Sequence, residues 1–235
     1  MKHDEKATRP DTPTVRVPRP ANEVFGERLP LAKRYAEILA DSGVAHGLIG
    51  PRETPRLWDR HLLNCAVVEE LLPHRTRLID VGSGAGLPGL VLALMRPDLE
   101  VRLIEPMLRR TTWLEETIAQ LGLKNVTVHR GRAEELRGRV QAEVVTARAV
   151  ARLGQLATWC LPLLTPGGRL LALKGESAEQ ELEEDRAVLA RMGVTDVEIV
   201  LAGQDVLATP TRVVVITRPE RVRGGSATTG PVRRR

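Results

Sequence analysis

Residues 78–89 read LIDVGSGAGLPG, an apolar run that leads into a cluster of glycines and then a proline. This order predicts a buried strand, a tight turn and a helix that begins at Pro88. Glycines let a ligand approach the main chain, and a helix N-terminus presents N–H groups without partners inside the helix. No Gly-Lys-Ser/Thr string follows, so the turn is not a phosphate-binding P-loop. The stretch predicts a site for a nucleotide-like ligand of another kind.

Two cofactors compete for this turn. A dinucleotide fingerprint has its third glycine at the sixth position; counted from Gly82 that position is Leu87, and counted from Gly84 the pattern fits but begins two residues late. Asp80 separates the two alternatives, because a carboxylate at the strand end repels a pyrophosphate and attracts a cation. S-adenosylmethionine carries a sulfonium and an ammonium group and no phosphate. The turn, which includes Gly86, therefore favours S-adenosylmethionine over NAD.

A second acidic residue supports a nucleoside in either case. Glu105 ends the next predicted strand, 23 residues after Gly82, close to the spacing of about 20 residues at which a carboxylate binds ribose hydroxyls. The segment GRAEE, residues 131–135, follows the third predicted strand, where an acidic side chain or a backbone amide could meet the adenine edge.

Short apolar runs alternate with helical patterns from residue 77 onward, which predicts an α/β fold with a mostly parallel, Rossmann-like sheet of seven strands covered on both faces. We expect strands at 77–81, 101–105, 125–129, 143–147, 169–174, 197–201 and 213–217. We expect helices at 88–95, 108–121, 152–164 and 178–192, with a weak turn at 133–136. Only a loop joins the last two strands, which suits an antiparallel hairpin at one end of the sheet.

Two further helices are expected before the first strand. One occupies about 22–41 and stops at Gly43; the second starts at Thr54 as N-cap with Pro55 at the first helical position, and ends before Pro73. We therefore expect one folded domain at 21–217, with N-terminal helices at 21–75 and the sheet at 76–217. Disordered tails are expected at 1–20 and 218–235, the latter rich in arginine.

The composition is that of a soluble globular chain, at 42% hydrophobic and 28% charged residues, and no apolar run of about 18 residues could cross a membrane. The N-terminus has no signal core, and two cysteines cannot build a disulfide framework or a four-cysteine zinc site, so we expect a cytoplasmic protein without a metal.

The net charge of +5 suggests that the protein binds nucleic acid, but the presence of only five aromatic residues argues against a sheet that stacks RNA bases. The positive charge lies in the two tails, because 218–235 carries six arginines against one glutamate. We expect these tails to add salt-sensitive attraction to RNA.

Five segments resemble, in order and spacing, the bacterial glucose-inhibited division protein B family. They are RLWDRHLLNC (56–65), LIDVGSGAGLPGLVLALMRPD (78–98), RAEEL (132–136), TARAVARLGQL (146–156) and PGGRLLALKG (166–175). The resemblance covers about residues 30–217 and implies a class I S-adenosylmethionine-dependent methyltransferase that methylates N7 of one guanine in 16S ribosomal RNA. It implies 16S RNA or the small ribosomal subunit as partner, and we expect a monomer.

By this resemblance, cofactor contacts fall on Gly82, Leu87, Ala133, Glu134 and Arg148, in addition to the residues of the glycine turn and Glu105. Two segments depart from the family pattern: Asn64 stands where the family commonly has Asp, and GLIGPRE (47–53) stands where it often has an Asn-Leu-Thr string. Both lie outside the expected cofactor pocket, so they bear on RNA contacts.

Several methyl-transfer chemistries lack their residues here. Residues 146–149 read Thr-Ala-Arg-Ala, where enzymes that methylate exocyclic amines carry Asn/Asp-Pro-Pro-aromatic, and Arg148 stands where a ribose methyltransferase would need an acid. Methylation of pyrimidine C5 needs a cysteine nucleophile, but Cys65 and Cys160 fall in predicted helices as small core residues. Guanine N7 has a free lone pair and no proton, so the pattern permits N7 transfer without an acid or base and does not by itself establish it.

Four cationic or titratable residues are candidates for positioning the substrate. Arg60 and His61 lie on the second N-terminal helix, and Arg148 and Lys174 end the fourth and fifth predicted strands, at the edge where such sheets bind ligands. The charged run at 176–185 is expected to be an exposed helix face. A methyltransferase acting on a small molecule or protein, an NAD-dependent oxidoreductase and a non-catalytic RNA-binding module stay open as alternatives.

Overall fold

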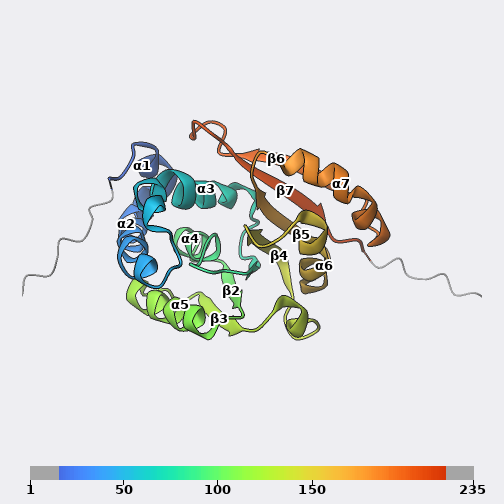
Figure 1. The fold of residues 1–235 in the computed structure, drawn as a ribbon, viewed down its shortest axis with the longest axis horizontal. Helices are drawn as coiled ribbons and strands as arrows, with labels where there is room; N and C mark the ends of the chain where they lie inside the picture. The colour runs from blue at the N-terminus through green and yellow to red at the C-terminus, as the bar shows by residue number, and fades with distance from the viewer. Residues whose placement is uncertain (1–15, 221–235) are drawn as a thin grey trace, which may run out of the picture.

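The computed structural model describes residues 16–220. Its centre is a seven-stranded sheet with the order β3-β2-β1-β4-β5-β7-β6, in which only β7 runs antiparallel to its neighbours (Figure 1). The strands are β1 (Arg77–Val81), β2 (Glu100–Glu105), β3 (Val126–Arg130), β4 (Ala142–Arg148), β5 (Leu164–Lys174), β6 (Val197–Ala202) and β7 (Thr211–Thr217). The predicted fold class and the terminal antiparallel hairpin are confirmed, and β7 also pairs with β5, so that β6 forms the edge.

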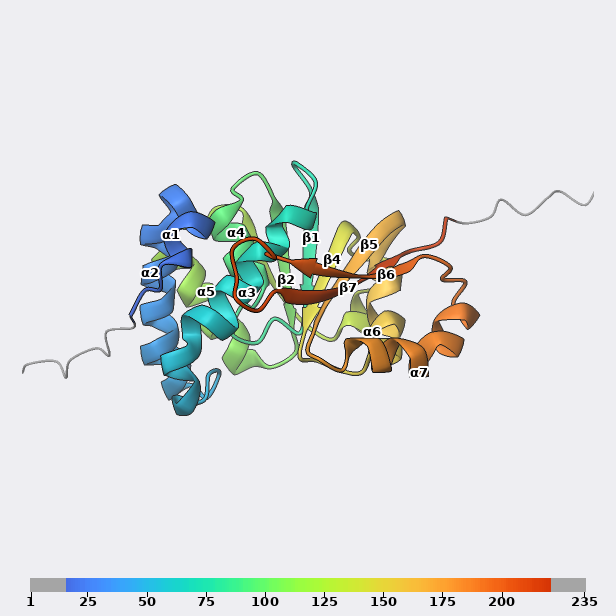
Figure 2. The ribbon, with the colours of Figure 1, turned by 90° about the horizontal axis from the view of Figure 1, so that it is seen from above.

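Both faces of the sheet are buried, because the strands are apolar at successive positions. In β1, Leu78 packs into one core and Ile79 into the other, as the two-residue period of a strand requires. Helices α4 (Gly89–Met95) and α5 (Leu108–Leu121), together with the N-terminal helices, contribute to the first core; α6 (Leu153–Cys160) and α7 (Ala178–Arg191) contribute to the second. Figure 2 shows these two groups of helices toward opposite ends of the molecule, with the strands between them.

The N-terminal segment packs on α4 and α5 as a layer of short helices (Figure 1). Its elements are α1 (Pro20–Phe25), η1 (Gly26–Arg28), α2 (Leu29–Ile38), η2 (Leu39–Gly43), η3 (Pro51–Arg56), η4 (Leu57–Leu62), α3 (Leu63–Ala66) and η5 (Val67–Leu71). The remaining short helices are η6 (Ala133–Leu136) and η7 (Leu161–Leu163). Tyr35 and Trp113 are buried where α2 meets α5, which ties this layer to the sheet domain.

Two predicted helix ends are wrong. Gly43 does not stop the first helix, because its amide stays within a wider π-helical turn and the helical backbone continues past it. The second helix does not begin at Thr54: the 3₁₀ helix η3 begins at Pro51, contains Pro55 and leads into η4. Pro55 is tolerated as the fifth residue of η3 because so short a 3₁₀ segment has few backbone hydrogen bonds that the missing N–H could interrupt.

The tail predictions fall largely outside the described residues. The expected disordered segments at 1–20 and 218–235 overlap the structure only at 16–20 and 218–220, and α1 already begins at Pro20. Within residues 16–220, no helix is both long and apolar enough to cross a bilayer.

Candidate functional site

The glycine turn lies between β1 and α4, as predicted. Gly82 has φ of 69°, and its N–H and that of Ser83 both donate to the carbonyl of Ile104, at 2.9 and 3.1 Å. A Cβ built on Gly82 would lie 2.8 Å from Cγ2 of Val150. The position thus requires glycine for two reasons, which are its left-handed backbone conformation and the close approach of the loop that follows β4.

The Asp80 carboxylate supports this turn from below. Its Oδ2 accepts the N–H of Gly89 at 3.2 Å and its Oδ1 accepts the hydroxyl of Thr146 at 2.9 Å, and the side chain is fully buried. Burial raises its pKa to about 6. The carboxylate points at the start of α4, where the free amide of the first turn attracts it, and the cofactor role of Asp80 stays a prediction.

A tyrosine from the N-terminal layer fixes the other side of the turn. The hydroxyl of Tyr35, fully buried in α2, donates to the carbonyl of Ala85. A Cβ on Gly86 would lie 3.0 Å from this hydroxyl, so Gly86 gives it access. The sequence pattern places Tyr35 only on the apolar face of a helix. Tyr35 is the sole tyrosine of the chain, and a buried tyrosine hydroxyl usually needs a hydrogen-bond partner, which is a weak signal of this contact.

A cavity of about 210 Å³ opens beside the turn, with a mostly apolar wall. It is lined by Val81, Gly82, Ile104, Pro106, Gly131, Arg132, Ala133, Glu134, Val150 and Trp159. Three of the predicted cofactor residues, Gly82, Ala133 and Glu134, therefore meet at one cavity although 51 residues separate the first from the second. Its size suits the nucleoside part of a cofactor rather than a whole dinucleotide.

Glu105 and the other predicted cofactor residues do not line this cavity. Glu105 is nearly fully buried; its Oε2 accepts the Gly84 N–H at 3.1 Å and its Oε1 accepts the Met107 N–H at 3.0 Å. It therefore joins the end of β2 to the glycine turn. Gly86 and Leu87 form the far part of the turn, and Leu87 is packed into the first core.

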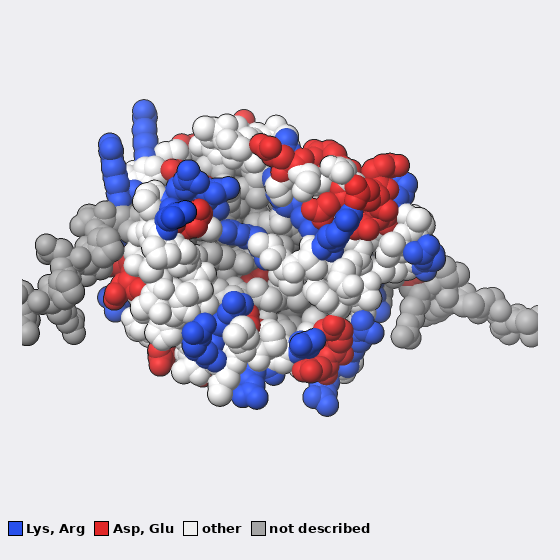
Figure 3. Space-filling model, viewed as in Figure 1, with Lys and Arg blue, Asp and Glu red and all other residues white. Residues whose placement is uncertain are grey.

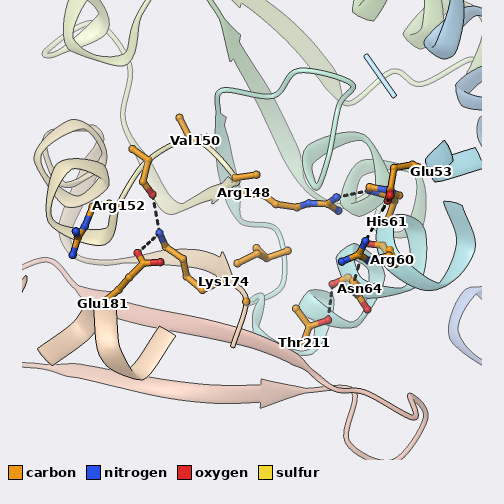
Figure 4. Close-up of a pocket in the computed structure, with 14 residues that line it drawn as sticks. Glu53, Arg60, His61, Asn64, Arg148, Val150, Arg152, Lys174, Glu181 and Thr211 are labelled. Atoms are coloured by element: carbon orange, nitrogen blue, oxygen red, sulfur yellow. Dashed lines mark hydrogen bonds and ion pairs between the residues drawn. The ribbon is translucent and has the colours of Figure 1, made fainter. Parts of the chain in front are cut away.

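A second, larger cavity of about 680 Å³ lies over the carboxyl ends of β4 and β5. Its walls come from η3, η4 and α3 on one side and from the loops after β4 and β5 on the other (Figure 4). It is lined by Glu53, Arg60, His61, Asn64, Arg148, Ala149, Val150, Ala151, Arg152, Leu173, Lys174, Gly175, Glu181 and Thr211. All four predicted positioning residues, from three distant parts of the chain, thus meet here. Arg148 lines this cavity and not the smaller one.

Arg148, His61 and Glu53 form a chain of hydrogen bonds on one wall (Figure 4). The Arg148 guanidinium donates to Nδ1 of His61 and to the thiol sulfur of Cys65, at 3.1 Å for the latter, and Nε2 of His61 lies 3.0 Å from Oε2 of Glu53. Because arginine only donates, Nδ1 must be unprotonated and Nε2 must donate to Glu53. Burial and the nearby Arg148 lower the pKa of His61, in agreement with a neutral ring. Sequence reasoning missed Glu53, whose only signal is its place eight residues before His61.

Lys174 and Glu181 face Arg148 from the opposite wall (Figure 4). Nζ of Lys174 lies 2.7 Å from Oε2 of Glu181 and 2.7 Å from the carbonyl of Ala151, and only 10% of its side chain is exposed. Glu181 also accepts the Leu153 N–H at 3.2 Å, at the first residue of α6. The prediction that 176–185 is only an exposed helix face is therefore wrong for Glu181, which the unpaired amides of α6 draw inward.

Val150 separates the two cavities and lines both. Its side chain rests on Gly82, and the preceding Ala149 has φ of 53°, the left-handed region that residues with a Cβ rarely adopt. Strained backbone of this kind persists where the surroundings enforce it, commonly at functional sites.

The charges around the large cavity are unequally distributed. In Figure 3 carboxylates gather over α7, and lysine and arginine side chains lie over the N-terminal helices across from them. Within residues 16–220, no cluster of three or more histidine, cysteine or acidic side chains could hold a metal. Cys65 and Cys160 are fully buried, and burial raises the pKa of both thiols, so neither is a nucleophile; their prediction as core residues is confirmed.

Residues 28–208 match the family model described as rRNA small subunit methyltransferase G. The chain is 60% identical over 197 residues to a ribosomal RNA small subunit methyltransferase G of Thermobifida fusca, which covers 84% of this chain and 83% of the relative. It is 54% identical over 228 residues to the protein of that name in Streptomyces coelicolor, covering 93% of this chain and 95% of the relative.

Solved structures show the same fold at low sequence identity. A putative S-adenosylmethionine-dependent methyltransferase of Methanococcus maripaludis aligns with a TM-score of 0.55 at 15% identity, over 81% of this chain and 93% of that one. A SAM-dependent O-methyltransferase of Thermotoga maritima aligns with a TM-score of 0.52 at 18% identity, over 68% and 66%. These two structures share the fold of this chain.

Proposed function

The chain belongs to the rRNA small subunit methyltransferase G family and takes S-adenosylmethionine as its cofactor, and we propose that it methylates N7 of a guanine of 16S ribosomal RNA held in the large cavity. The observation that carries this proposal is the pair of adjoining cavities. One lies beside the glycine turn, the other is lined by cationic and acidic side chains, and Val150 lines both.

The residues of the smaller cavity fit the cofactor. Position 82 requires glycine because a Cβ there would collide with Val150 on the cavity wall. The apolar walls from Val81, Ile104 and Trp159 suit a purine ring. Glu134 and the backbone at Ala133 would meet the adenine edge, and Glu105 lies within reach of the turn that a ribose would approach. When bound there, the cofactor supplies an electrophilic methyl group on a positively charged sulfur.

Methyl transfer in the large cavity requires no acid or base from the chain. Guanine N7 offers its lone pair without losing a proton, so the task of the protein is to hold the ring in line with the methyl group. At about 680 Å³ the cavity is within the usual range of about 300–1,000 Å³ for ligand sites, which is ample for one nucleotide.

Arg148 is the residue that we assign to hold the guanine nucleotide. It extends from the end of β4 beside Val150, and the neutral His61 and Glu53 fix the direction of its guanidinium. Methylation at N7 leaves a positive charge on the purine, and the carboxylates of Glu53 and Glu181 in the same cavity offset that charge. Lys174 keeps Glu181 in place from the end of β5.

In this proposal the protein acts as a monomer. Its partner is 16S RNA, either free or within the small ribosomal subunit. The test is the nucleoside content of 16S RNA from a strain that lacks the protein. Loss of one 7-methylguanosine, restored by the wild-type chain, supports the proposal. An unchanged set of 7-methylguanosines contradicts it, and methylation of a metabolite or a protein without RNA would assign the cavity to another substrate.

A further inference from the structure

A third cavity, of about 440 Å³, continues the large one toward the loop between β6 and β7. The two share five lining residues, Arg60, Asn64, Lys174, Gly175 and Thr211, so they form one groove. The far end of this groove is formed by residues 207–212 and by Pro20 at the start of α1. Nothing in the methyl transfer requires this extension.

We propose that this third cavity binds the nucleotide next to the target guanine on the same RNA strand, with its phosphate held between Arg60 and Arg212. This rests on the proposed function. Neighbouring nucleotides are covalently joined, so a guanine in the large cavity must place its neighbours on surfaces continuous with it. The groove provides such a surface on one side of the large cavity, with room for one nucleotide.

The two arginines are available for a phosphate. Arg60 has a side chain that is 58% exposed and lies 3.6 Å from Glu53; Arg212 is 33% exposed and lies 3.3 Å from Glu179. Exposed ion pairs of this kind are weak, so a phosphate can replace either carboxylate at little cost. Lys174, by contrast, is nearly buried and already paired with Glu181, which makes it part of the wall between the two cavities.

The surroundings direct the strand to this side. Across the large cavity from Arg60, α7 carries Glu179, Glu181 and Glu184, and Figure 3 shows carboxylates gathered over that helix. Glu181 and Glu184 repel a phosphodiester from that side, whereas Glu179 is paired with Arg212. Asp59 and Glu176 also line the third cavity, so the attraction for a phosphate is confined to Arg60 and Arg212 themselves. Within the groove, the amide of Asn64 and the main chain of the β6–β7 loop offer donors and acceptors to a base edge; the Thr211 hydroxyl is already used, since it donates to the carbonyl of Asn64 at 3.1 Å.

The test measures methyl transfer to 16S RNA by the full chain at several salt concentrations, together with calorimetric binding of S-adenosylmethionine. Arg212→Gln removes one phosphate contact, and Ala208→Glu places a carboxylate in the groove from an exposed loop position, with Ala208→Gln as its size-matched control. Arg186→Gln is the control for charge, because Arg186 lies on α7 outside both cavities, paired with Glu183.

We expect Arg212→Gln and Ala208→Glu to raise KM for RNA about tenfold at moderate salt, and Arg212→Gln to lower the salt dependence of binding by about 0.7 in the logarithmic slope. Binding of S-adenosylmethionine should be unchanged in both. Arg186→Gln should resemble wild type, and Ala208→Gln, which has the size but not the charge of the glutamate, should raise KM less than Ala208→Glu does. If Arg212→Gln and Ala208→Glu keep the KM of the wild type, and Arg212→Gln keeps its salt slope, the third cavity does not bind the neighbouring nucleotide. That result leaves the proposed function intact. Absence of transfer to RNA by the wild-type chain would instead remove the proposed function.

Discussion

The guanidinium of Arg148 donates to Nδ1 of His61, which joins the end of β4 to the N-terminal helical layer. The ring of His61 is in turn held by Glu53 at 3.0 Å. Arg148, which we propose to face the RNA, is thus positioned by residues that come from a part of the chain outside the sheet. The N-terminal layer for this reason forms a wall of the large cavity and is not only a cover for α4 and α5.

Loss of the His61 contact should release Arg148. His61→Ala is expected to lower kcat for RNA about tenfold, because the guanidinium keeps only Cys65 as a partner, while S-adenosylmethionine binding is retained. His61→Asn, whose amide oxygen can replace Nδ1 as acceptor, should recover most of the rate. Equal rates for His61→Ala and wild type would show that the contact has no part in catalysis.

Removal of the Tyr35 hydroxyl should weaken both the fold and the cofactor site. Tyr35→Phe leaves the carbonyl of Ala85 without its donor in a buried place, which costs about 1–3 kcal/mol of unfolding free energy. We expect the Kd for S-adenosylmethionine to rise several-fold, measured by calorimetry. Ser42→Ala is the matched control, because it removes the acceptor of Trp113 at 3.0 Å in the same layer, away from the turn. That variant should lose stability only; a shared loss of affinity would contradict a specific role for Tyr35.

An alanine at Gly82 should abolish cofactor binding. The new Cβ would meet Val150 at 2.8 Å and would also hold a left-handed backbone at a cost of about 1–2 kcal/mol. Gly122→Ala separates the two effects, because Gly122 has φ of 66° with open space around it, at the end of α5. Gly122→Ala should unfold at lower urea but bind S-adenosylmethionine normally. Normal binding by Gly82→Ala would place the cofactor elsewhere.

Asp80 gives stability a distinctive pH dependence. Its pKa is raised from 3.8 in the unfolded chain to about 6, so between these values the folded state binds a proton that the unfolded state does not. The contribution of Asp80 to stability is therefore greatest below about pH 4 and falls as pH rises to about 6, by roughly 3 kcal/mol in total. The measurement is the difference in unfolding free energy between wild type and Asp80→Asn from pH 4 to pH 7.

Asparagine keeps an acceptor for the Gly89 amide and has no charge to bury. We therefore expect Asp80→Asn to gain stability relative to wild type as pH rises through this window. A difference that is constant with pH, or one that shrinks as pH rises, contradicts a raised pKa at Asp80.

The sheet could be predicted from the sequence because its strands are continuous apolar runs and its helices are separated by clear turns. Gly82, Glu105 and Arg148 were placed at the correct edge by the same logic, since the carboxyl ends of parallel strands share one edge. The partner of Asp80 could not be predicted, because its bond to the Gly89 amide depends on how α4 packs against β1.

Side-chain contacts that depend on how the helices pack could not be predicted from the sequence. Glu53 reaches His61 because η3 folds back on η4, and the proline pattern at residues 51–55 instead predicted a helix start. Glu181 turns inward because the amide of Leu153 is unpaired at the start of α6, a partner 28 residues away in a helix of its own. The placement of Val150 against Gly82 follows from the backbone of Ala149, for which no residue pattern is diagnostic.

We propose that a methyl group passes from the turn cavity to guanine N7 in the large cavity. The most direct measurement uses the purified full chain, 16S RNA transcripts and S-adenosylmethionine with a labelled methyl group, followed by digestion of the RNA to nucleosides. We predict that the label is found in 7-methylguanosine, and that a transcript made with 7-deazaguanosine, which has carbon in place of N7, takes up none. Label in any other nucleoside, or equal uptake by the 7-deaza transcript, would contradict the account.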